Sequence, residues 1–287
     1  MIRRILRAGA PLVAVAVALL VSFTVPAAAE LADALGAEHT AHWGGFLPAV
    51  GPVAEVVTGT YNRIFWIILV IGILVEALIL WCLFKFRRSK RGDKVSNFSH
   101  NTTLEVLWTV IPVLICVYIG YISYHGLRFM RTMPAEHLAV EVVAHQFYWD
   151  FDYPDQGISA PEGERHEQLS SAGQDRTVKH LVVPVNTNVV VNVTAADVLH
   201  AFYVPALGVK VDAIPGRINY LWFNADEEGD YIGQCAELCG AAHGEMFFNV
   251  RVVSQDAWKA WVNEQRKANG LEPMAFAEAP AAVPAKL

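Results

Sequence analysis

The sequence predicts a membrane-anchored all-β protein, in which a two-helix transmembrane hairpin precedes an antiparallel β-sandwich or barrel. Two observations lead to this prediction. The three longest apolar runs all lie within the first 123 residues, and beyond residue 130 short strand-like stretches of alternating apolar and polar residues replace them. With 287 residues, 54% of them hydrophobic and 17% charged, the chain has room for one sizeable globular domain beside its membrane segments.

Residues 1–29 have the pattern of a secretory signal peptide. Three arginines stand within the first seven residues, an apolar stretch covers residues 11–25, and three alanines end at Ala29. A basic start, a short apolar core and small residues at the end are what signal peptidase requires. We therefore expect cleavage after Ala29 and a mature chain that starts at Glu30, with residues 30–62 as a periplasmic segment. The alternative is an uncleaved third membrane helix.

Two longer apolar segments, residues 64–84 and 104–123, predict the hairpin, which we place at residues 63–124. At a rise of ~1.5 Å per residue, either segment can span a hydrocarbon core ~30 Å thick. The densest basic cluster of the chain, residues 85–91, lies between them and predicts a cytoplasmic loop. Both termini then face the periplasm, as the signal peptide also requires. These features predict a two-pass protein of the bacterial inner (plasma) membrane.

Two residues inside the spans are unusual. Glu76 is the single charge in the first span, and an intramembrane carboxyl group is a functional candidate. The alternative is a protonated side chain packed against a neighbouring helix, and both interpretations imply a partner in the membrane. Pro112 lies inside the second span and predicts a kink, which neighbouring helices tolerate by satisfying the freed carbonyl.

The soluble domain is predicted at residues 131–268. Residues 154–176 are polar and are expected to form a surface loop, and Ser254 is a candidate N-cap for a helix that runs to about residue 268. The Ala/Pro-rich tail at residues 269–287 is expected to lack a fold. The predicted strands are residues 139–143, 146–153, 180–183, 189–194, 218–223, 230–233 and 246–253.

The charge of this domain limits its partners. Between residues 135 and 270 there are 9 Lys and Arg against 19 Asp and Glu, a formal charge of −10, compared with −6 for the whole chain. Such a field argues against nucleic acid and suits a basic partner. Many soluble domains are acidic for solubility alone, so the charge by itself does not identify that partner.

Residues 235–246 predict a metal centre. Cys235, Cys239, His243 and Met246 have the spacing C-x3-C-x3-H-x2-M, and His200 precedes Cys235 by 35 residues. Thiolates, imidazoles and a weak thioether are the ligands of copper sites for electron transfer. Two thiolates can each bridge two copper ions, and each histidine would then complete one of them.

Met246 and the backbone carbonyl of Glu237 would supply the remaining ligands, one on each copper. A disulfide between Cys235 and Cys239 is the first alternative, because the compartment is oxidising. Zinc is the second, although a thioether ligand would be out of place there. The other two cysteines, Cys82 and Cys116, lie in the spans and are expected to be packing residues.

At these residues the sequence closely resembles subunit II of the haem–copper cytochrome c oxidases, over about residues 60–267. The most specific segments are Asp197-Val198-Leu199-His200, Asp212-Ala213-Ile214-Pro215-Gly216-Arg217 and the loop from Cys235 to Met246. The resemblance implies a cupredoxin-like domain with a binuclear copper centre, CuA. The copper ligands that it implies are His200, Cys235, Glu237 (through its carbonyl), Cys239, His243 and Met246.

The same resemblance implies two further roles. The side chain of Glu237 would help to hold a magnesium ion shared with subunit I. Glu105, in Glu105-Val106-Leu107-Trp108-Thr109, matches the family's glutamate at the entrance of a proton channel in subunit I. The alternative for Glu105 is a carboxylate that merely lies at the water interface.

The segment expected to take up electrons departs from the family pattern. The family usually has Gln-Trp-Tyr-Trp, whereas this chain has Gln146-Phe147-Tyr148-Trp149, and Ala201-Phe202 follows His200 where a tryptophan is usual. We expect Phe147 to mark the docking position, with Tyr148 or Trp149 as alternatives. Strand alternation would place Phe147 and Trp149 on one face and Tyr148 on the other.

The resemblance implies the electron-accepting subunit of a proton-pumping cytochrome c oxidase. Its expected partners are cytochrome c as donor, the haem-bearing subunit I, to which copper passes electrons for reduction of oxygen to water, and subunit III. Alternatives are the CuA-bearing subunit of a membrane nitric oxide reductase and a periplasmic copper-binding or copper-delivery protein. A quinol oxidase is disfavoured because its equivalent subunit lacks the copper ligands. No Cys-x-x-Cys-His motif occurs in these 287 residues, so we expect no cytochrome c domain among them.

Overall fold

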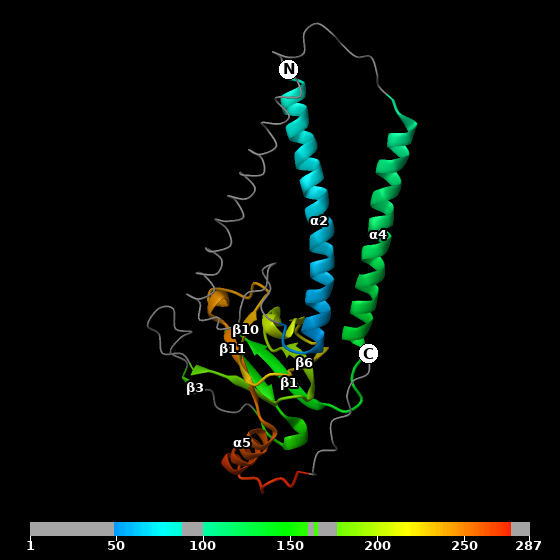
Figure 1. The fold of residues 1–287 in the computed structure, drawn as a ribbon. Helices are drawn as coiled ribbons and strands as arrows, with labels where there is room; N and C mark the ends of the chain where they lie inside the picture. The colour runs from blue at the N-terminus through cyan, green and yellow to red at the C-terminus, as the bar shows by residue number, and fades with distance from the viewer. Residues whose placement is uncertain (1–48, 88–99, 160–163, 166–176, 277–287) are drawn as a thin grey trace. The chain divides into compact units, whose positions relative to one another are not determined.

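A computed structural model describes residues 49–87, 100–159, 164–165 and 177–276 (Figure 1). The predicted signal peptide, the basic loop beyond residue 87 and the last eleven residues lie outside this part of the chain. Two of its helices, α2 (Pro52–Lys85) and α4 (Thr102–Arg131), are long and apolar enough to cross a membrane. They contain the two predicted spans but extend beyond them, because hydropathy marks only the apolar part of a helix.

The first turn of α2 packs into the β-domain. The Val50 N–H donates to the Ala206 carbonyl at 3.0 Å, and Val53 and Ala54 are buried. Gly208, with a φ of 66°, allows this approach, because a Cβ there would lie 2.7 Å from the Cα of Ala54. Close backbone contacts therefore hold the first turn of α2 against the β-domain.

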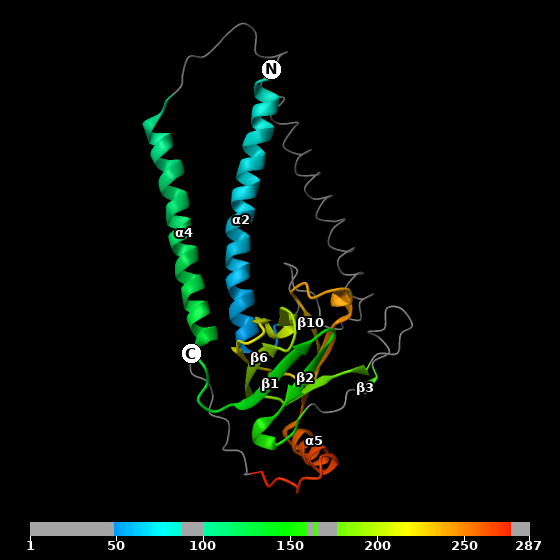
Figure 2. The same cartoon turned by 180° about the vertical axis from the view of Figure 1, so that it is seen from behind.

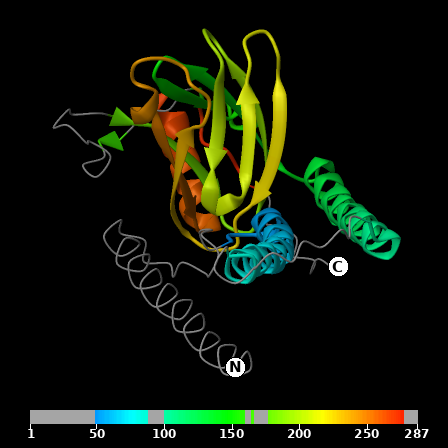
Figure 3. The same cartoon turned by 90° about the horizontal axis from the view of Figure 1, so that it is seen from above.

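The β-domain consists of two principal sheets (Figures 2 and 3). One has the order β2-β1-β6-β9 and the other β5-β11-β10-β7-β8, while β3 and β4 form a short separate pair. The strands are β1 (Leu138–His145), β2 (Tyr148–Asp152), β3 (Glu164–Arg165), β4 (Thr177–Val178), β5 (His180–Pro184), β6 (Asn188–Ala195), β7 (His200–Val204), β8 (Val209–Ala213), β9 (Asn219–Asn224), β10 (Gly229–Cys235) and β11 (Phe247–Val253). Within the described residues, the short 3₁₀ helices η1 (Pro154–Gln156), η3 (Pro205–Leu207) and η4 (His243–Glu245) accompany them.

The two-sheet architecture confirms the predicted sandwich, with three differences in detail. The pairs β1–β6 and β11–β5 are parallel, so the sheets are mixed rather than purely antiparallel. Strand direction is set by long connections, which alternation within a strand does not reveal. Strands β3, β4, β7 and β8 were missed. In β7, four of the five residues are buried and the strand does not alternate. The third difference concerns β2, which begins at Tyr148 rather than at Gln146.

Buried aromatic side chains from both sheets fill the core below the copper ligands predicted from the sequence. Trp149 of β2, Phe202 of β7 and Phe248 of β11 contact one another, with ring centroids 4.7 to 5.9 Å apart. All three side chains are at most 1% exposed. Aromatic groups packed in this way bury a large area and hold their neighbours in fixed positions.

Helix α5 (Gln255–Ala268), labelled in Figure 2, confirms the last predicted element. It packs against β5. Ser254 caps it as predicted, since its hydroxyl accepts a hydrogen bond from the Ala257 N–H at 3.3 Å. Residues 269–276 have no regular secondary structure, but they are not an unfolded tail. The Met274 N–H donates to the Asn263 side chain at 2.7 Å, and the ring of Phe276 packs edge-to-face against that of Trp258.

Candidate metal centre

Two cysteines, two histidines and a methionine converge at one end of the β-domain. The Sγ atoms of Cys235 and Cys239 are 3.9 Å apart. His200 Nδ1 lies 3.8 Å from the sulfur of Cys235, and His243 Nδ1 lies 3.6 Å from that of Cys239. The Met246 Sδ is 3.9 Å from the Cys239 sulfur. Each sulfur therefore has one imidazole beside it, and the two sulfurs face each other.

The strand order of the second sheet brings these residues together. His200 is the first residue of β7 and Cys235 the last of β10, and these two strands are paired through Cys235 and Phe202. The loop that follows returns to β11 at Met246, whose carbonyl accepts a hydrogen bond from the Cys235 N–H at 3.0 Å. A loop with both ends fixed in this way holds its side chains close to the neighbouring strand.

His200 is completely buried and is held in one orientation. Its Nε2 lies 2.8 Å from Asp197 Oδ1, so Nε2 carries the proton and the lone pair of Nδ1 points towards Cys235. Burial opposes ionisation of Asp197, but hydrogen bonds from His200 and from the N–H groups of Val198 and Gln146 outweigh it and lower its pKa to about 2. The carboxylate thus fixes the histidine that offers its free nitrogen to the site.

The sulfur separation distinguishes a metal site from a disulfide. A disulfide requires an S–S distance of ~2.05 Å, and both thiols are free at 3.9 Å. A metal ion ~2.3 Å from each thiolate, as in zinc sites, fits this spacing because twice that distance exceeds 3.9 Å. The two sulfurs would therefore be able to hold a metal together at the spacing that they have here.

The Cys239 thiol is a weaker acid than a free thiol when no metal is bound. Burial, together with the neighbouring Cys235, raises the pKa of the Cys239 thiol to about 12. A buried thiol of this kind gives up its proton when a cation takes the proton's place. The donor set of two sulfurs, two imidazoles and a thioether suits copper better than zinc, for which a thioether is a poor ligand.

Glu237 presents two different groups. Its backbone carbonyl lies 3.3 Å from the Cys235 sulfur, at the metal site, whereas the residue as a whole is exposed. All six ligands predicted from the sequence are therefore brought together by the fold. The carboxylate of Glu237 is not needed for the metal site, and its role as a magnesium ligand stays a prediction.

The segment predicted to take up electrons forms a turn. His145 pairs with Tyr148, so Gln146 and Phe147 connect β1 to β2 and do not belong to a strand. The alternation argument for Phe147 and Trp149 was therefore wrong, since it applies only within a strand. Tyr148 is 46% exposed, whereas Trp149 is buried with its ring 6.2 Å from that of His200.

Phe147 lies close to the metal loop. A Cβ on Gly240, next to Cys239, would be 3.1 Å from the Phe147 ring. Sequence reasoning missed a second feature of this turn, which is that Gln146 makes hydrogen bonds to both parts of the site. No signal in the sequence links Gln146 to residues 51 and 93 positions away.

Glu105 lies in the first turn of α4 and is not part of the metal site. Its Oε1 is 2.7 Å from His100 Nδ1 and accepts a hydrogen bond from the Asn101 N–H at 3.4 Å. The Asn101 side chain in turn accepts a hydrogen bond from the Leu104 N–H at 3.1 Å and caps the helix. Glu105 therefore has a local role at the helix start, and its predicted role at a proton channel stays a prediction.

Glu76 is exposed in the middle of α2. Val56 and Thr60 mark the side of α2 that faces α4, since a Cβ on Gly126 of α4 would meet both of them. At about 100° per residue, Glu76 points about 180° away from that side. A partner for its carboxyl group would therefore come from outside the hairpin.

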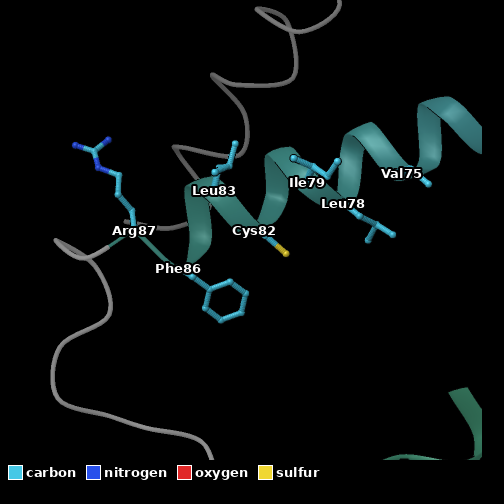
Figure 4. Close-up of a pocket in the computed structure, with 7 residues that line it drawn as sticks. All are labelled: Val75, Leu78, Ile79, Cys82, Leu83, Phe86 and Arg87. Carbon is cyan, nitrogen blue, oxygen red and sulfur yellow. The ribbon is translucent and has the colours of Figure 1, made fainter. Parts of the chain in front are cut away.

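An apolar pocket along the same helix has no connection with the metal site (Figure 4). All of its lining residues within the described part of the chain come from the C-terminal turns of α2 and the two residues that follow the helix, so it belongs to the apolar surface of the span. The lining residues are Val75, Leu78, Ile79, Cys82, Leu83, Phe86 and Arg87. Cys82 and Cys116 are both exposed on their helices rather than packed in a core.

Comparison of the sequence with known proteins shows which family the chain is similar to. Residues 138–253 match the family described as cytochrome c oxidase subunit II, periplasmic domain, and residues 40–125 match the transmembrane domain of the same subunit. The chain is 41% identical over 245 residues to cytochrome c oxidase subunit 2 of Cereibacter sphaeroides, with 77% of this chain and 80% of the relative covered.

A second relative is also similar in sequence, and a solved structure is similar to part of the chain. A probable cytochrome c oxidase subunit 2 of Rickettsia bellii is 35% identical over 235 residues, with 79% of this chain and 86% of the relative covered. Among solved structures, the periplasmic domain of subunit II of the cytochrome oxidase of Bradyrhizobium japonicum is 38% identical, with a TM-score of 0.44. The matched region covers 48% of this chain and 99% of the chain in that structure.

Proposed function

The chain belongs to the cytochrome c oxidase subunit II family, and from that premise we propose that it accepts electrons one at a time from a cytochrome c and passes them through a binuclear copper centre to haem in subunit I. Reduction of oxygen to water and proton pumping then take place in subunit I. Both the membrane and the soluble part match this one family, which favours the oxidase over a nitric oxide reductase subunit or a copper-delivery protein.

The observation that carries the proposal is the pair of thiols held 3.9 Å apart between two imidazoles. Copper, when bound, supplies a centre that takes up and releases one electron. The six residues that would hold it are His200, Cys235, Glu237 (through its carbonyl), Cys239, His243 and Met246. The buried side chains of His200, Cys235, Cys239 and Met246 keep water away from the ligands, and Asp197 fixes the orientation of His200.

The exposed carboxylate of Glu237 supports a second part of the proposal. Its carbonyl faces the copper site while its side chain is free to reach a neighbouring protein. We assign this side chain to a magnesium ion shared with subunit I, since carboxylate oxygens are the ligands that magnesium prefers. Such an ion would join the two subunits next to the path of the electron.

The orientation in the membrane follows from charge. The basic residues 85–91 would lie in the cytoplasm, so the metal domain and both termini would face the periplasm of a bacterial inner membrane. Glu105, at the cytoplasmic start of α4, would then lie where protons enter subunit I. The intact mass of the mature subunit tests the signal peptide, and a mass that includes residues 1–29 would contradict cleavage.

Copper analysis of the purified complex tests the proposal as a whole. We expect two copper ions in this domain of each chain and a mixed-valence resonance signal shared over both nuclei, and the soluble fragment from about residue 131 should be purple. Cys235→Ser should abolish that signal, because a hydroxyl group is too hard a ligand to bridge two copper ions. Recovery of one intact disulfide and no copper from native membranes would refute the site.

A further inference from the structure

Gln146 makes hydrogen bonds to both parts of the candidate copper site from the turn between β1 and β2. Its backbone N–H donates to Asp197 Oδ2 at 2.6 Å, and its side-chain Nε2 donates to the Cys239 carbonyl at 2.7 Å. Asp197 and Cys239 belong to different parts of the chain, one before β7 and the other in the loop between β10 and β11. One residue thus joins the two segments that supply the ligands.

On the histidine side, the contact acts through Asp197. One oxygen of that carboxylate accepts the Gln146 N–H, and the other accepts from His200 Nε2 at 2.8 Å and from the Val198 N–H at 2.6 Å. The carboxylate is therefore held by three donors. Partners of this kind, one step away from a metal ligand, fix its tautomer and ring orientation.

On the cysteine side, the contact acts on the backbone of a ligand. Within the loop, the His243 N–H donates to Gly240 and the Met246 N–H to His243, and these short-range bonds shape the loop without fixing its place in the domain. The Ala236 N–H donates to the Ala201 carbonyl at 3.0 Å and fixes the Cys235 half of the loop to β7. The Gln146 side chain provides an external hydrogen bond at the Cys239 half.

The neighbourhood of Gly240 shows how closely the turn lies on the loop. Gly240 has a φ of 136°, and a Cβ there would be 3.1 Å from both the Gln146 Nε2 and the Phe147 ring. The residue assigned to donor docking and the residue that holds Cys239 are therefore consecutive and cover the same glycine. A displacement of this turn would reach the ligand loop directly.

We propose that Gln146 is a positioning residue of the copper centre, which holds Cys239 in register with His200 and links the electron-uptake turn to the metal ligands. This inference rests on the proposed function. Gln146 does not touch the metal itself, so its loss should leave both thiolates and both imidazoles in the chain. What should change is their relative placement, and with it the sharing of the electron between two copper ions.

The test compares Gln146→Met with a matched control, Gln255→Met, in the purified oxidase complex. Gln255 also donates through its side-chain amide, to the Val185 carbonyl at 2.8 Å, but it lies at the start of α5. We expect Gln146→Met to keep two copper ions per chain while the copper hyperfine pattern and midpoint potential change. Gln255→Met should leave both signals as in the unmodified protein.

A hyperfine pattern and potential unchanged in Gln146→Met would overturn the inference. If that variant fails to fold, Gln146→Glu takes its place, because it keeps the shape and polarity of glutamine but cannot donate when ionised. The copper content, hyperfine pattern and midpoint potential of Gln146→Glu are then compared with those of the unmodified protein, with the same outcomes expected. Absence of a copper-pair signal from the unmodified protein would instead refute the proposed function, so the two failures are distinguishable.

Discussion

Met246 is the ligand of the candidate copper centre whose removal should alter the redox potential without emptying the site. Its side chain is 1% exposed and its sulfur lies 3.9 Å from that of Cys239. Leucine fills a similar volume, so Met246→Leu should cost less than about 1.5 kcal/mol in free energy of unfolding. Both thiolates and both imidazoles remain, and we therefore expect copper to stay bound.

The midpoint potential should shift because a thioether binds the two redox states of copper unequally. Each ~1.4 kcal/mol of difference between those states corresponds to ~59 mV for a one-electron couple. Metal analysis measures the copper content, an optical redox titration measures the midpoint potential, and thermal unfolding measures the stability. The assay is best carried out on the intact complex, in which electron transfer to haem can be followed in the same sample.

Two controls separate ligand loss from packing. Met246→Ala also removes the thioether but leaves a cavity, so it should shift the potential similarly and cost about 2–5 kcal/mol in stability. Met133→Leu changes a methionine that packs elsewhere against the core, and it should leave the potential alone. Complete loss of copper from a folded Met246→Leu protein, or a potential unchanged in it, would refute the assigned role.

Lys179 forms an ion pair with Asp150 of β2, next to the turn between β1 and β2. Lys179→Met should leave that carboxylate without its lysine partner and speed reduction of the copper centre by a basic cytochrome at low salt. Stopped-flow rates should fall as salt shortens the Debye length to ~10 Å at 0.1 M, and a rate independent of salt would contradict electrostatic docking. Phe147→Ala should slow electron uptake with the copper spectrum unchanged, whereas Phe147→Trp should keep or raise the rate. No effect of Phe147→Ala, combined with loss of uptake in Trp149→Phe, would move the docking site elsewhere. Gly208→Val should destabilise the domain by about 1–3 kcal/mol more than Gly216→Val in thermal unfolding, because both positions have positive φ but only the first meets Ala54. Equal losses would show that the contact with α2 contributes nothing.

The copper ligands could be predicted from the sequence because coordination chemistry depends on residue types and short spacings. Cys235, Cys239, His243 and Met246 lie in one loop, and a loop of that length cannot separate its ligands widely. His200 lies 35 residues before the loop, so residue types made it a candidate ligand and the resemblance to a family supported that choice. The pairing of β7 with β10 provides the physical reason for that link.

The contacts of the electron-uptake turn could not be predicted in the same way. Gln146-Phe147-Tyr148-Trp149 has the composition of a strand, and its first two residues form a turn only because β1 pairs with β2 through His145 and Tyr148. The hydrogen bonds of Gln146 depend on where that turn lies relative to a loop 93 residues away. Tertiary packing decides such contacts, and local pattern carries no information about them.

Four carboxylates of the domain, Asp150, Asp152, Asp155 and Asp197, are those that the sequence suggests for attraction of a basic donor, and the structure shows that they are not equivalent. Asp150 is paired with Lys179 and lies 3.3 Å from His145, while Asp197 is engaged with His200 and two backbone N–H groups. The opposite charges of a close ion pair cancel at distances much larger than their separation. Asp150 therefore adds little to the electrostatic potential that an approaching protein meets. Asp197 keeps its charge, because its pKa of about 2 leaves it ionised at neutral pH. Attraction of a basic donor should therefore depend on the excess charge of −10 summed over the domain, and on Asp197 more than on Asp150.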